Sequence, residues 1–355
     1  MASSQITYTV GYQLVLSRIC SNSCGYCEFP IAQKNHLPSK KIVLSRIQRA
    51  AENGATTVKL VSGERISEHP SILTNIKYYG FNRYFDYVKM VTESIISVNS
   101  SFFLFPILDL GVLSFTDLIL YRDWIFSLRL ALESSDNCLM SNLAHRLSPG
   151  KKLDVRTSSL ISAGQAKIPT STGILLGIGE NQNSRFKSLE IISKIYEQFG
   201  HIQSVSINRF YPIAGTPMAD KSTISNREFI YFIKCAKKIL PPAIPIQIDI
   251  NKEENLLPYL IEAGVTDLGE IEISDNNETP LEKRLESIYS KINGLNVELR
   301  ERLPVFDDYI FKGWFPERFL PLIKGFYSTK LKKPELSPKI NFCIVAKKNQ
   351  FLQAS

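Results

Sequence analysis

The sequence lacks a long uncharged apolar run. No stretch reaches the roughly 18 residues that a membrane-spanning helix needs, so we expect neither a membrane span nor a membrane partner. The opening residues, Met-Ala-Ser-Ser-Gln, also lack the basic start and the apolar core of a secretory signal. We therefore expect a cytoplasmic protein in a reducing compartment.

Cysteine is scarce, with six residues among 355, and in a reducing compartment these six are not expected to form a disulfide framework. Three of them lie within eight residues, at positions 20, 24 and 27. The other three, Cys138, Cys235 and Cys343, lie far apart in the sequence. We expect these three to be ordinary buried thiols.

The sequence shows neither an internal repeat nor a low-complexity segment, and its 44% hydrophobic and 21% charged residues are typical of a globular protein. Its net charge is +8, but residues 324–355 hold seven lysines and one acid, so the rest is nearly neutral. We predict a core domain over residues 1–323 and a basic C-terminal extension over residues 324–355. Because its basic residues lack interleaved aromatic platforms and do not line the clustered cysteines, no nucleic-acid partner is expected.

Eight short apolar runs alternate with amphipathic helical patterns along the chain. The predicted strands cover residues 12–16, 57–62, 101–107, 126–132, 171–177, 203–207, 246–250 and 268–273. Most of these runs are continuously apolar, which favours a parallel sheet that is buried on both faces. The alternation predicts an α/β fold that resembles a TIM barrel, either partial or full.

The clustered cysteines follow the first predicted strand in the spacing Cys20-x3-Cys24-x2-Cys27. Three thiolates on one loop can hold three corners of an iron–sulfur cube and leave the fourth iron open to a small ligand. An open iron is what the cleavage of S-adenosylmethionine requires. Two alternatives remain at this point, namely a thiol-redox pair of Cys24 and Cys27, and structural zinc with His36 as a fourth ligand.

Other strand ends of the predicted barrel carry polar groups or glycines that would face this loop. Gly63 permits a bend beside Glu64, whose carboxylate could accept hydrogen bonds from the methionine ammonium of the cofactor. Glu133 could accept hydrogen bonds from ribose hydroxyls, and Arg156 could pair with the methionine carboxylate. Gly177, with the glycines at 173 and 179, would let an adenine approach the backbone.

The cysteine loop, with Tyr26 before its third cysteine, resembles that of the radical S-adenosylmethionine (radical SAM) superfamily. Within it, the chain resembles the cyclising subunit (subunit 1) of deazaflavin (FO) synthase over residues 8 to 310. The segments that carry this resemblance are Cys24-Gly-Tyr-Cys-Glu-Phe29, Val61-Ser-Gly-Glu-Arg65, Ile168-Pro-Thr-Ser-Thr-Gly-Ile-Leu-Leu-Gly-Ile-Gly-Glu180, Gly200-His-Ile-Gln203, Gly215-Thr-Pro-Met218 and Leu299-Arg-Glu-Arg-Leu-Pro-Val305.

This resemblance implies a 4Fe-4S cluster held by the three clustered cysteines, bound S-adenosylmethionine, and an electron donor. It places Tyr26 near the adenine, Glu64 at the methionine amino group, and Glu133 and Arg156 at the cofactor. It implies a lyase that acts on a small-molecule adduct, which a partner radical SAM subunit (subunit 2) makes from tyrosine and 5-amino-6-ribitylaminouracil. Hydrogen abstraction, ring closure and loss of ammonia give FO, the precursor of coenzyme F-420.

Four residues depart from the family pattern, and all of them follow substrate-facing strand ends. Asp109 stands where asparagine is expected, Arg209 follows Asn208 in place of a Gln-Asn pair, Asp249 interrupts an expected Pro-Pro-Asn-Leu run, and Glu270 replaces a glycine. These departures keep three alternatives open: a same-fold radical enzyme with a changed substrate, a tyrosine-cleaving enzyme of the partner type, and a non-enzymatic zinc or nucleic-acid-binding module.

Overall fold

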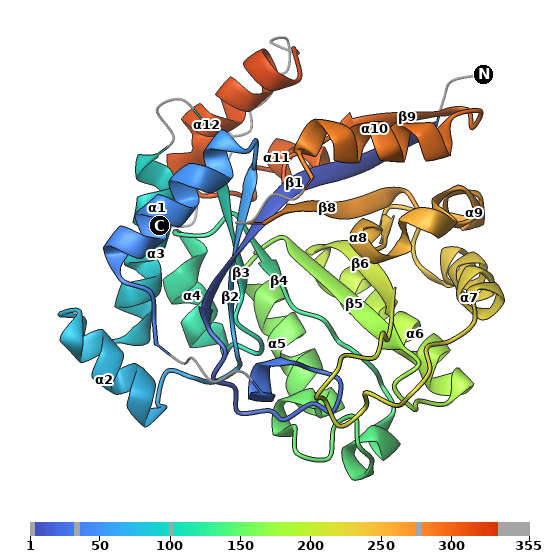
Figure 1. Cartoon of the computed structure of the whole chain (residues 1–355), viewed down its shortest axis with the longest axis horizontal. Coiled ribbons are helices and arrows are strands. Elements are labelled where there is room, and N and C mark those ends of the chain that lie inside the picture. Colours follow the sequence, from blue (N-terminus) through green and yellow to red (C-terminus); the bar gives the residue numbers. More distant parts are fainter. Residues whose placement is uncertain (1–3, 32–35, 99–101, 275–278, 333–355) are drawn as a thin grey trace.

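Eight parallel strands close into a barrel in this computed structural model, which describes residues 4–31, 36–98, 102–274 and 279–332 (Figure 1). β1 pairs with both β2 and β8, which closes the ring, and β9 pairs with the free N-terminal part of β1. The strands are β1 (Ser4–Ser17), β2 (Thr57–Ser62), β3 (Phe105–Asp109), β4 (Ser127–Arg129), β5 (Thr170–Leu176), β6 (Ile202–Arg209), β7 (Ile246–Gln247), β8 (Asp267–Ile273) and β9 (Val297–Glu301).

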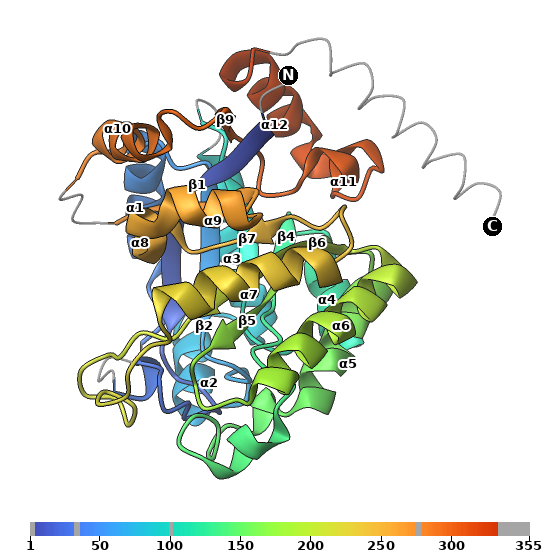
Figure 2. The same ribbon diagram turned by 90° about the vertical axis from the view of Figure 1, so that its right-hand side faces the viewer.

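Helices form a layer around the barrel, as the two views in Figures 1 and 2 show. The α-helices are α1 (Lys40–Glu52), α2 (Pro70–Tyr78), α3 (Tyr84–Ser97), α4 (Phe115–Arg122), α5 (Leu153–Gln165), α6 (Gln182–Phe199), α7 (Asn226–Ile239), α8 (Ile250–Glu253), α9 (Leu257–Ala263), α10 (Leu281–Ile292), α11 (Asp307–Phe311) and α12 (Leu320–Gly325). Short helical turns are η1 (Phe29–Ile31), η2 (Asn137–Ser141), η3 (Pro149–Lys151), η4 (Glu254–Leu256), η5 (Glu317–Phe319) and η6 (Phe326–Lys330).

The local sequence explains why these segments adopt their structures. All six residues of β2 are buried, as expected for a strand covered by helices outside and by side chains of the lumen inside. Ser225 caps the N-terminus of α7, because its hydroxyl accepts a hydrogen bond from the backbone N–H of Glu228. The helix buries Phe229, Phe232 and two further apolar side chains on one face, which fixes its orientation against the barrel.

The prediction of a TIM-like barrel is confirmed, and the barrel is full. Each of the eight predicted strands corresponds to an observed one, although residue 101, where the third was expected to begin, lies outside the described residues. β1 begins at residue 4, well before the predicted residue 12, and β9 was not predicted. Both extensions depend on pairing between residues almost 300 positions apart, as between Ile6 and Leu299, which no local pattern reveals.

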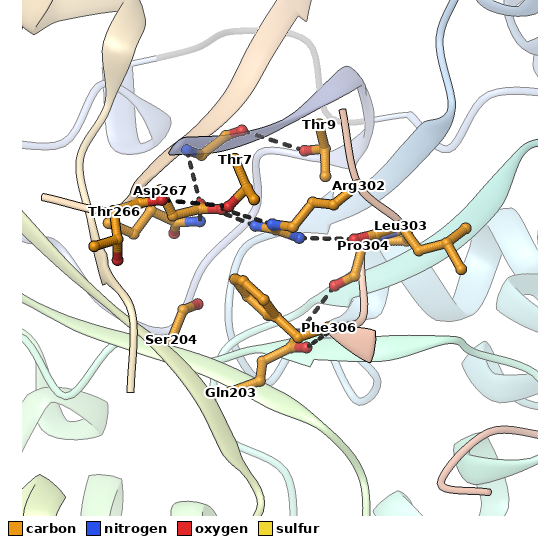
Figure 3. A network of polar contacts seen from close by, with 12 residues as sticks. Thr7, Thr9, Gln203, Ser204, Thr266, Asp267, Arg302, Leu303, Pro304 and Phe306 are labelled. Carbon is orange, nitrogen blue, oxygen red and sulfur yellow. Dashed lines mark hydrogen bonds and ion pairs between the residues drawn. The ribbon is translucent and has the colours of Figure 1, made fainter. Parts of the chain in front are cut away.

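A polar plug closes the lumen at the end where the strands begin (Figure 3). The guanidinium of Arg302, which follows β9, donates two hydrogen bonds to Asp267, with Nε 2.6 Å from Oδ2 and Nη2 2.9 Å from Oδ1. Thr7 on β1 donates to the same carboxylate, and Gln203 on β6 donates to the carbonyl of Pro304. The barrel is therefore accessible from its other end, where the strands finish.

The C-terminal part of the described chain packs against this closed end. Phe326 and Tyr327 are fully buried in an aromatic cluster with Phe105 of β3 and Phe126, which precedes β4. The predicted boundary after residue 323 falls inside α12, and Phe326 and Tyr327 beyond it belong to the aromatic cluster. The expectation for residues 333–355 lies outside the described residues. In the described part of the chain, every helix is too short or too polar to cross a membrane.

Candidate active site

The three clustered cysteines lie on the loop between β1 and η1, at the open end of the barrel. Backbone hydrogen bonds fix this loop to the segments that follow β2 and β4. The N–H of Ser21 donates to the carbonyl of Glu64 at 3.0 Å, and the N–H of Gly25 donates to the carbonyl of Ala144 at 3.0 Å. Cys20, Cys24 and Cys27 are therefore held in place by neighbouring strand ends, although none of them belongs to a regular element.

The thiols are free and stand in different environments. The sulfur of Cys20 accepts hydrogen bonds from the backbone N–H of Asn22 at 3.4 Å and of Glu64 at 3.2 Å. The sulfur of Cys27 accepts one from Phe29 at 3.5 Å. Burial raises the pKa of Cys24, and it raises the pKa of Cys27 to about 11. A metal that binds these sulfurs has to displace their protons, while the N–H groups stabilise the resulting thiolates.

This set of donors fits an iron–sulfur cube better than a single zinc ion. Among the described residues, no three His, Cys, Asp or Glu side chains converge on the position of one metal ion. His36, the fourth ligand in the zinc alternative, is exposed. In a cube each thiolate binds a different iron, so its three ligands stand apart, whereas tetrahedral zinc requires all its ligands around one point.

Gly63 lets the end of β2 touch the cysteine loop. A Cβ atom on this residue would lie 1.8 Å from the carbonyl oxygen of Ile19 and 2.5 Å from Cβ of Cys20. Any other residue would therefore push the two segments apart. The sequence prediction placed Gly63 at the cofactor because of the bend it permits, and the structure shows a close approach of two chain segments at this position.

Glu64 and Arg156 form a buried ion pair directly behind this glycine. Nη2 of Arg156, on α5, lies 2.9 Å from Oε2 of Glu64, which also accepts a hydrogen bond from the N–H of Val112 at 3.2 Å. Both residues are 3% exposed. Oε1 of Glu64 and Nε of Arg156 have no hydrogen-bond partner among the described residues. Because an unsatisfied buried polar group costs about 1–3 kcal/mol, a ligand with both a cationic and an anionic group would relieve this cost.

Glu133 lies four residues after the end of β4 and has a left-handed backbone conformation with φ of 68°. Its Oε1 accepts a hydrogen bond from Nζ of Lys151 at 2.6 Å. Although burial raises the pKa of Glu133, Lys151 and Arg156 lower it further, to about 2. The carboxylate is therefore charged and can accept hydrogen bonds from hydroxyl groups.

Tyr26 contacts the segment after η2 through its hydroxyl, which lies 3.1 Å from Nε2 of His145. Burial lowers the pKa of His145 to about 4 and raises that of Tyr26 well above its usual value. Both side chains are therefore neutral at pH 7. Their hydrogen bond fixes the ring of Tyr26, which is itself part of the cysteine loop.

Gly177 and Gly173 are next to protein atoms. A Cβ atom on Gly173 would lie 2.4 Å from the carbonyl of Ser206, and one on Gly177 would lie 3.0 Å from Cγ2 of Ile224. The N–H of Gly177, which has φ of 86°, donates to Oε1 of Glu180 at 2.8 Å. Strand packing and a tight turn account for these glycines, and their role towards an adenine stays a prediction.

A cavity of about 310 Å³ occupies the barrel lumen. All four residues that depart from the family pattern line it, although they are far apart in the sequence: Asp109 and Arg209 end β3 and β6, Asp249 follows β7, and Glu270 lies in the middle of β8. Most of the charged lining side chains are paired. Nζ of Lys59 lies 2.5 Å from Oε2 of Glu270. Nη1 of Arg129 lies 3.1 Å from Oδ2 of Asp109. The guanidinium of Arg209 donates two hydrogen bonds to the carboxylate of Glu253. The cavity therefore suits a polar ligand with many hydrogen-bonding groups.

Several residues of the site were missed in the sequence. Lys59 interrupts an otherwise apolar strand, and this break in the pattern is a signal that could have indicated a lumen-facing charge. Lys151 and His145 left no comparable signal because they lie in a short helical turn and a loop without a periodic pattern. Of the isolated cysteines, Cys138 is exposed, which contradicts the expectation of a buried thiol, because it lies on the short surface turn η2. Cys235 is partly exposed, and Cys343 lies outside the described residues.

Comparisons with known proteins were made for the whole chain. No protein-family model matches it. A "7,8-didemethyl-8-hydroxy-5-deazariboflavin synthase" of Methanococcoides burtonii is 34% identical over 332 residues, which cover 90% of this chain and 95% of the relative. The synthase of the same description from Archaeoglobus fulgidus is 32% identical over 328 residues, which cover 90% of this chain and 96% of the relative.

Solved structures share the fold at low sequence identity. The [FeFe]-hydrogenase maturase HydG is 14% identical with a TM-score of 0.70, covering 90% of this chain and 69% of its own. Methylornithine synthase (PylB) is 19% identical with a TM-score of 0.61, covering 83% of this chain and 84% of its own. At these identities the two structures support the barrel fold alone.

Proposed function

The chain belongs to the family of 7,8-didemethyl-8-hydroxy-5-deazariboflavin (FO) synthases, and from this membership we propose that it closes the deazaflavin ring as a radical SAM lyase. The proposed substrate is the hydroxybenzyl-ribityliminouracil adduct that a partner radical SAM subunit makes from tyrosine and 5-amino-6-ribitylaminouracil. The proposed products are FO and ammonia. FO is the precursor of coenzyme F-420.

One observation carries this proposal: the cysteine loop and the Glu64–Arg156 pair meet at the open end of the barrel, above a polar cavity. We propose that Cys20, Cys24 and Cys27 hold a 4Fe-4S cluster whose fourth iron is open. Bound there, such a cluster would supply the single electron that radical chemistry with S-adenosylmethionine requires. The Arg302–Asp267 plug, at the end of the barrel where the strands begin, would keep this chemistry away from bulk water.

The side chains around the loop have the polarity that the cofactor needs. The free oxygen of Glu64 and the free nitrogen of Arg156 suit the ammonium and the carboxylate of a methionine group. The charged Glu133 suits ribose hydroxyls, and the ring of Tyr26, fixed by His145, suits the flat face of an adenine. The substrate would then occupy the cavity that Asp109, Arg209, Asp249 and Glu270 line.

Anaerobic reconstitution with iron and sulfide tests the cluster. The wild-type chain should bind four irons and turn brown, and Cys24→Ala should lose both the cluster and the formation of deoxyadenosine. Cys235→Ala, which changes a partly exposed cysteine on α7, is the matched control and should retain both. A colourless wild-type chain that binds one zinc ion tightly would contradict the radical function.

The substrate is tested by incubating the reconstituted chain with the partner enzyme, tyrosine and 5-amino-6-ribitylaminouracil. Deazaflavin fluorescence is the expected result. Formation of deoxyadenosine without fluorescence would instead indicate a changed substrate. Consumption of tyrosine without the partner enzyme would indicate an enzyme of the tyrosine-cleaving type.

A further inference from the structure

The lumen cavity reaches from the ends of the strands to the polar plug. Asp109 and Arg209, which end β3 and β6, line it, and so do Arg302 and Pro304 of the plug. The cavity therefore runs between the two ends of the barrel, although its volume is only about 310 Å³. A ligand that fills a space of this length and volume is elongated, with one end at the plug and the other at the open end.

The part of the cavity next to the plug is lined by neutral polar side chains. We call four of them the polar layer: Thr9 on β1 (labelled in Figure 3), Ser171 on β5, Ser206 on β6 and Gln247 on β7. The hydroxyl of Ser206 donates to Oε1 of Gln247 at 2.5 Å, and Nε2 of Gln247 donates to Oδ1 of Asp267 at 2.6 Å. Gln203 of the plug donates to the hydroxyl of Ser171 at 3.3 Å. These hydrogen bonds fix the polar layer directly on the plug.

Charge is distributed unevenly along the cavity. The charged side chains that end β3, β4 and β6, namely Asp109, Arg129 and Arg209, lie at the open end. At the plug, Arg302 and Asp267 neutralise each other in an ion pair, and the four side chains of the polar layer carry no charge. Hydroxyl and amide groups both donate and accept hydrogen bonds. The group that matches the polar layer is therefore a neutral chain with several hydroxyls, which also donate and accept.

We propose that the polar layer binds the ribityl chain of the substrate, so that this chain points towards the plug and the uracil ring faces the open end. The inference rests on the proposed function, because that function supplies a substrate with a ribityl chain. The reacting part of the substrate has to lie near the cysteine loop, which is at the open end. The ribityl chain takes no part in ring closure, so it suits the far part of the cavity, where it anchors the substrate by hydrogen bonds.

The test compares two ligands, FO and the same deazaflavin with a methyl group in place of the ribityl chain. Their affinities for the reconstituted full chain with S-adenosylmethionine are measured by equilibrium dialysis, with ligand fluorescence as the readout. Ser206→Ala and Thr9→Val each remove one hydroxyl from the polar layer. Ser193→Ala is the matched control: Ser193 on α6 is 7% exposed, as Ser206 is, and its hydroxyl donates to the carbonyl of Leu189 in the helix layer.

We expect wild type to bind FO at least about tenfold more tightly than the methyl analogue. Each variant of the polar layer should weaken FO binding about threefold to tenfold, the loss of one neutral hydrogen bond, and should bind the methyl analogue as wild type does. Ser193→Ala should bind both ligands normally.

With the partner enzyme, tyrosine and 5-amino-6-ribitylaminouracil, Ser206→Ala and Thr9→Val should raise the KM for the adduct with little change in kcat. Equal affinities of wild type for the two ligands, or an equal effect of a polar-layer variant on both, would overturn the proposal. Formation of FO by wild type in the coupled assay would then still support the proposed function, so the two failures are distinguishable.

Discussion

Arg156 and Glu64 are joined by an ion pair of 2.9 Å, with side chains only 4% and 3% exposed, directly behind the cysteine loop. A second buried pair, Arg302 with Asp267, plugs the opposite end of the barrel, with side chains 8% and 0% exposed (Figure 3). The two pairs share chemistry and burial. They differ in hydrogen bonding, because in the described part of the chain one carboxylate oxygen and one guanidinium nitrogen of the first pair have no partner.

This contrast gives the first prediction. Glu64→Gln should weaken the binding of S-adenosylmethionine about tenfold to a hundredfold, since a hydrogen bond to a charged group contributes about 1.5–3 kcal/mol. Asp267→Asn is the matched control. Each variant leaves a buried arginine unpaired and should lose about 3–5 kcal/mol of unfolding free energy, but Asp267→Asn should bind the cofactor normally. Equal affinities, measured by equilibrium dialysis, would contradict the assignment of Glu64.

Gly63→Ala should abolish cluster incorporation, because its Cβ would collide with the carbonyl of Ile19 and displace Cys20. The control is Gly80→Ala, where the added Cβ meets no atom of the described residues within 4 Å. Gly80 has φ of 79°, so the control should lose about 1–2 kcal/mol of stability and still bind four irons. Iron and sulfide content after reconstitution decides the prediction, and full cluster content in Gly63→Ala would refute it.

His201 is fully buried, and burial lowers its pKa from 6.5 to about 4. Between these two values the unfolded chain binds more protons than the folded one. The contribution of His201 to the free energy of unfolding is therefore fully present above pH 6.5. It is lost as the pH falls from 6.5 towards 4, and it does not change further below pH 4. The loss should reach about 3 kcal/mol.

Urea unfolding of wild type and His201→Leu at pH 8 and at pH 4 measures this contribution. From pH 8 to pH 4, the free energy of unfolding of the variant should fall by about 3 kcal/mol less than that of wild type. His145, whose pKa is also lowered to about 4, contributes in the same direction in both proteins. An identical pH dependence of the two proteins would show that His201 is not buried in its neutral form.

Lys59 and Glu270 form an ion pair across the lumen, made possible by Gly11, where a Cβ would lie 2.9 Å from Cδ of Glu270. Either Lys59→Met or Glu270→Gln leaves the partner unpaired and should cost about 2 kcal/mol, while the double variant should cost less than the sum. If the pair contacts substrate, Glu270→Gln should also raise the KM for the adduct without changing cofactor affinity. Additive stabilities, or an unchanged KM, would argue against these roles.

The local sequence was sufficient for much of the scaffold and for the grouping of three cysteines on one loop. A continuously apolar strand such as β2 carries its own pattern, because each residue is buried by the layers on both sides. The spacing of Cys20, Cys24 and Cys27 likewise brings three sulfurs onto one short loop whatever the rest of the chain does. These features depend on neighbours in sequence, which is why they could be predicted.

Only the tertiary structure decided how distant groups pair. It joined Glu64 to Arg156 across 92 positions, placed Glu270 over Gly11, and gathered four scattered departures from the family pattern around one cavity. It also packed Phe326 and Tyr327 against Phe105 and Phe126 of the barrel. Sequence determined which groups are present and where the eight barrel strands lie, but not β9 or the N-terminal part of β1. Barrel closure decided which of them meet, because parallel strands bring residues far apart in the chain to one shared end.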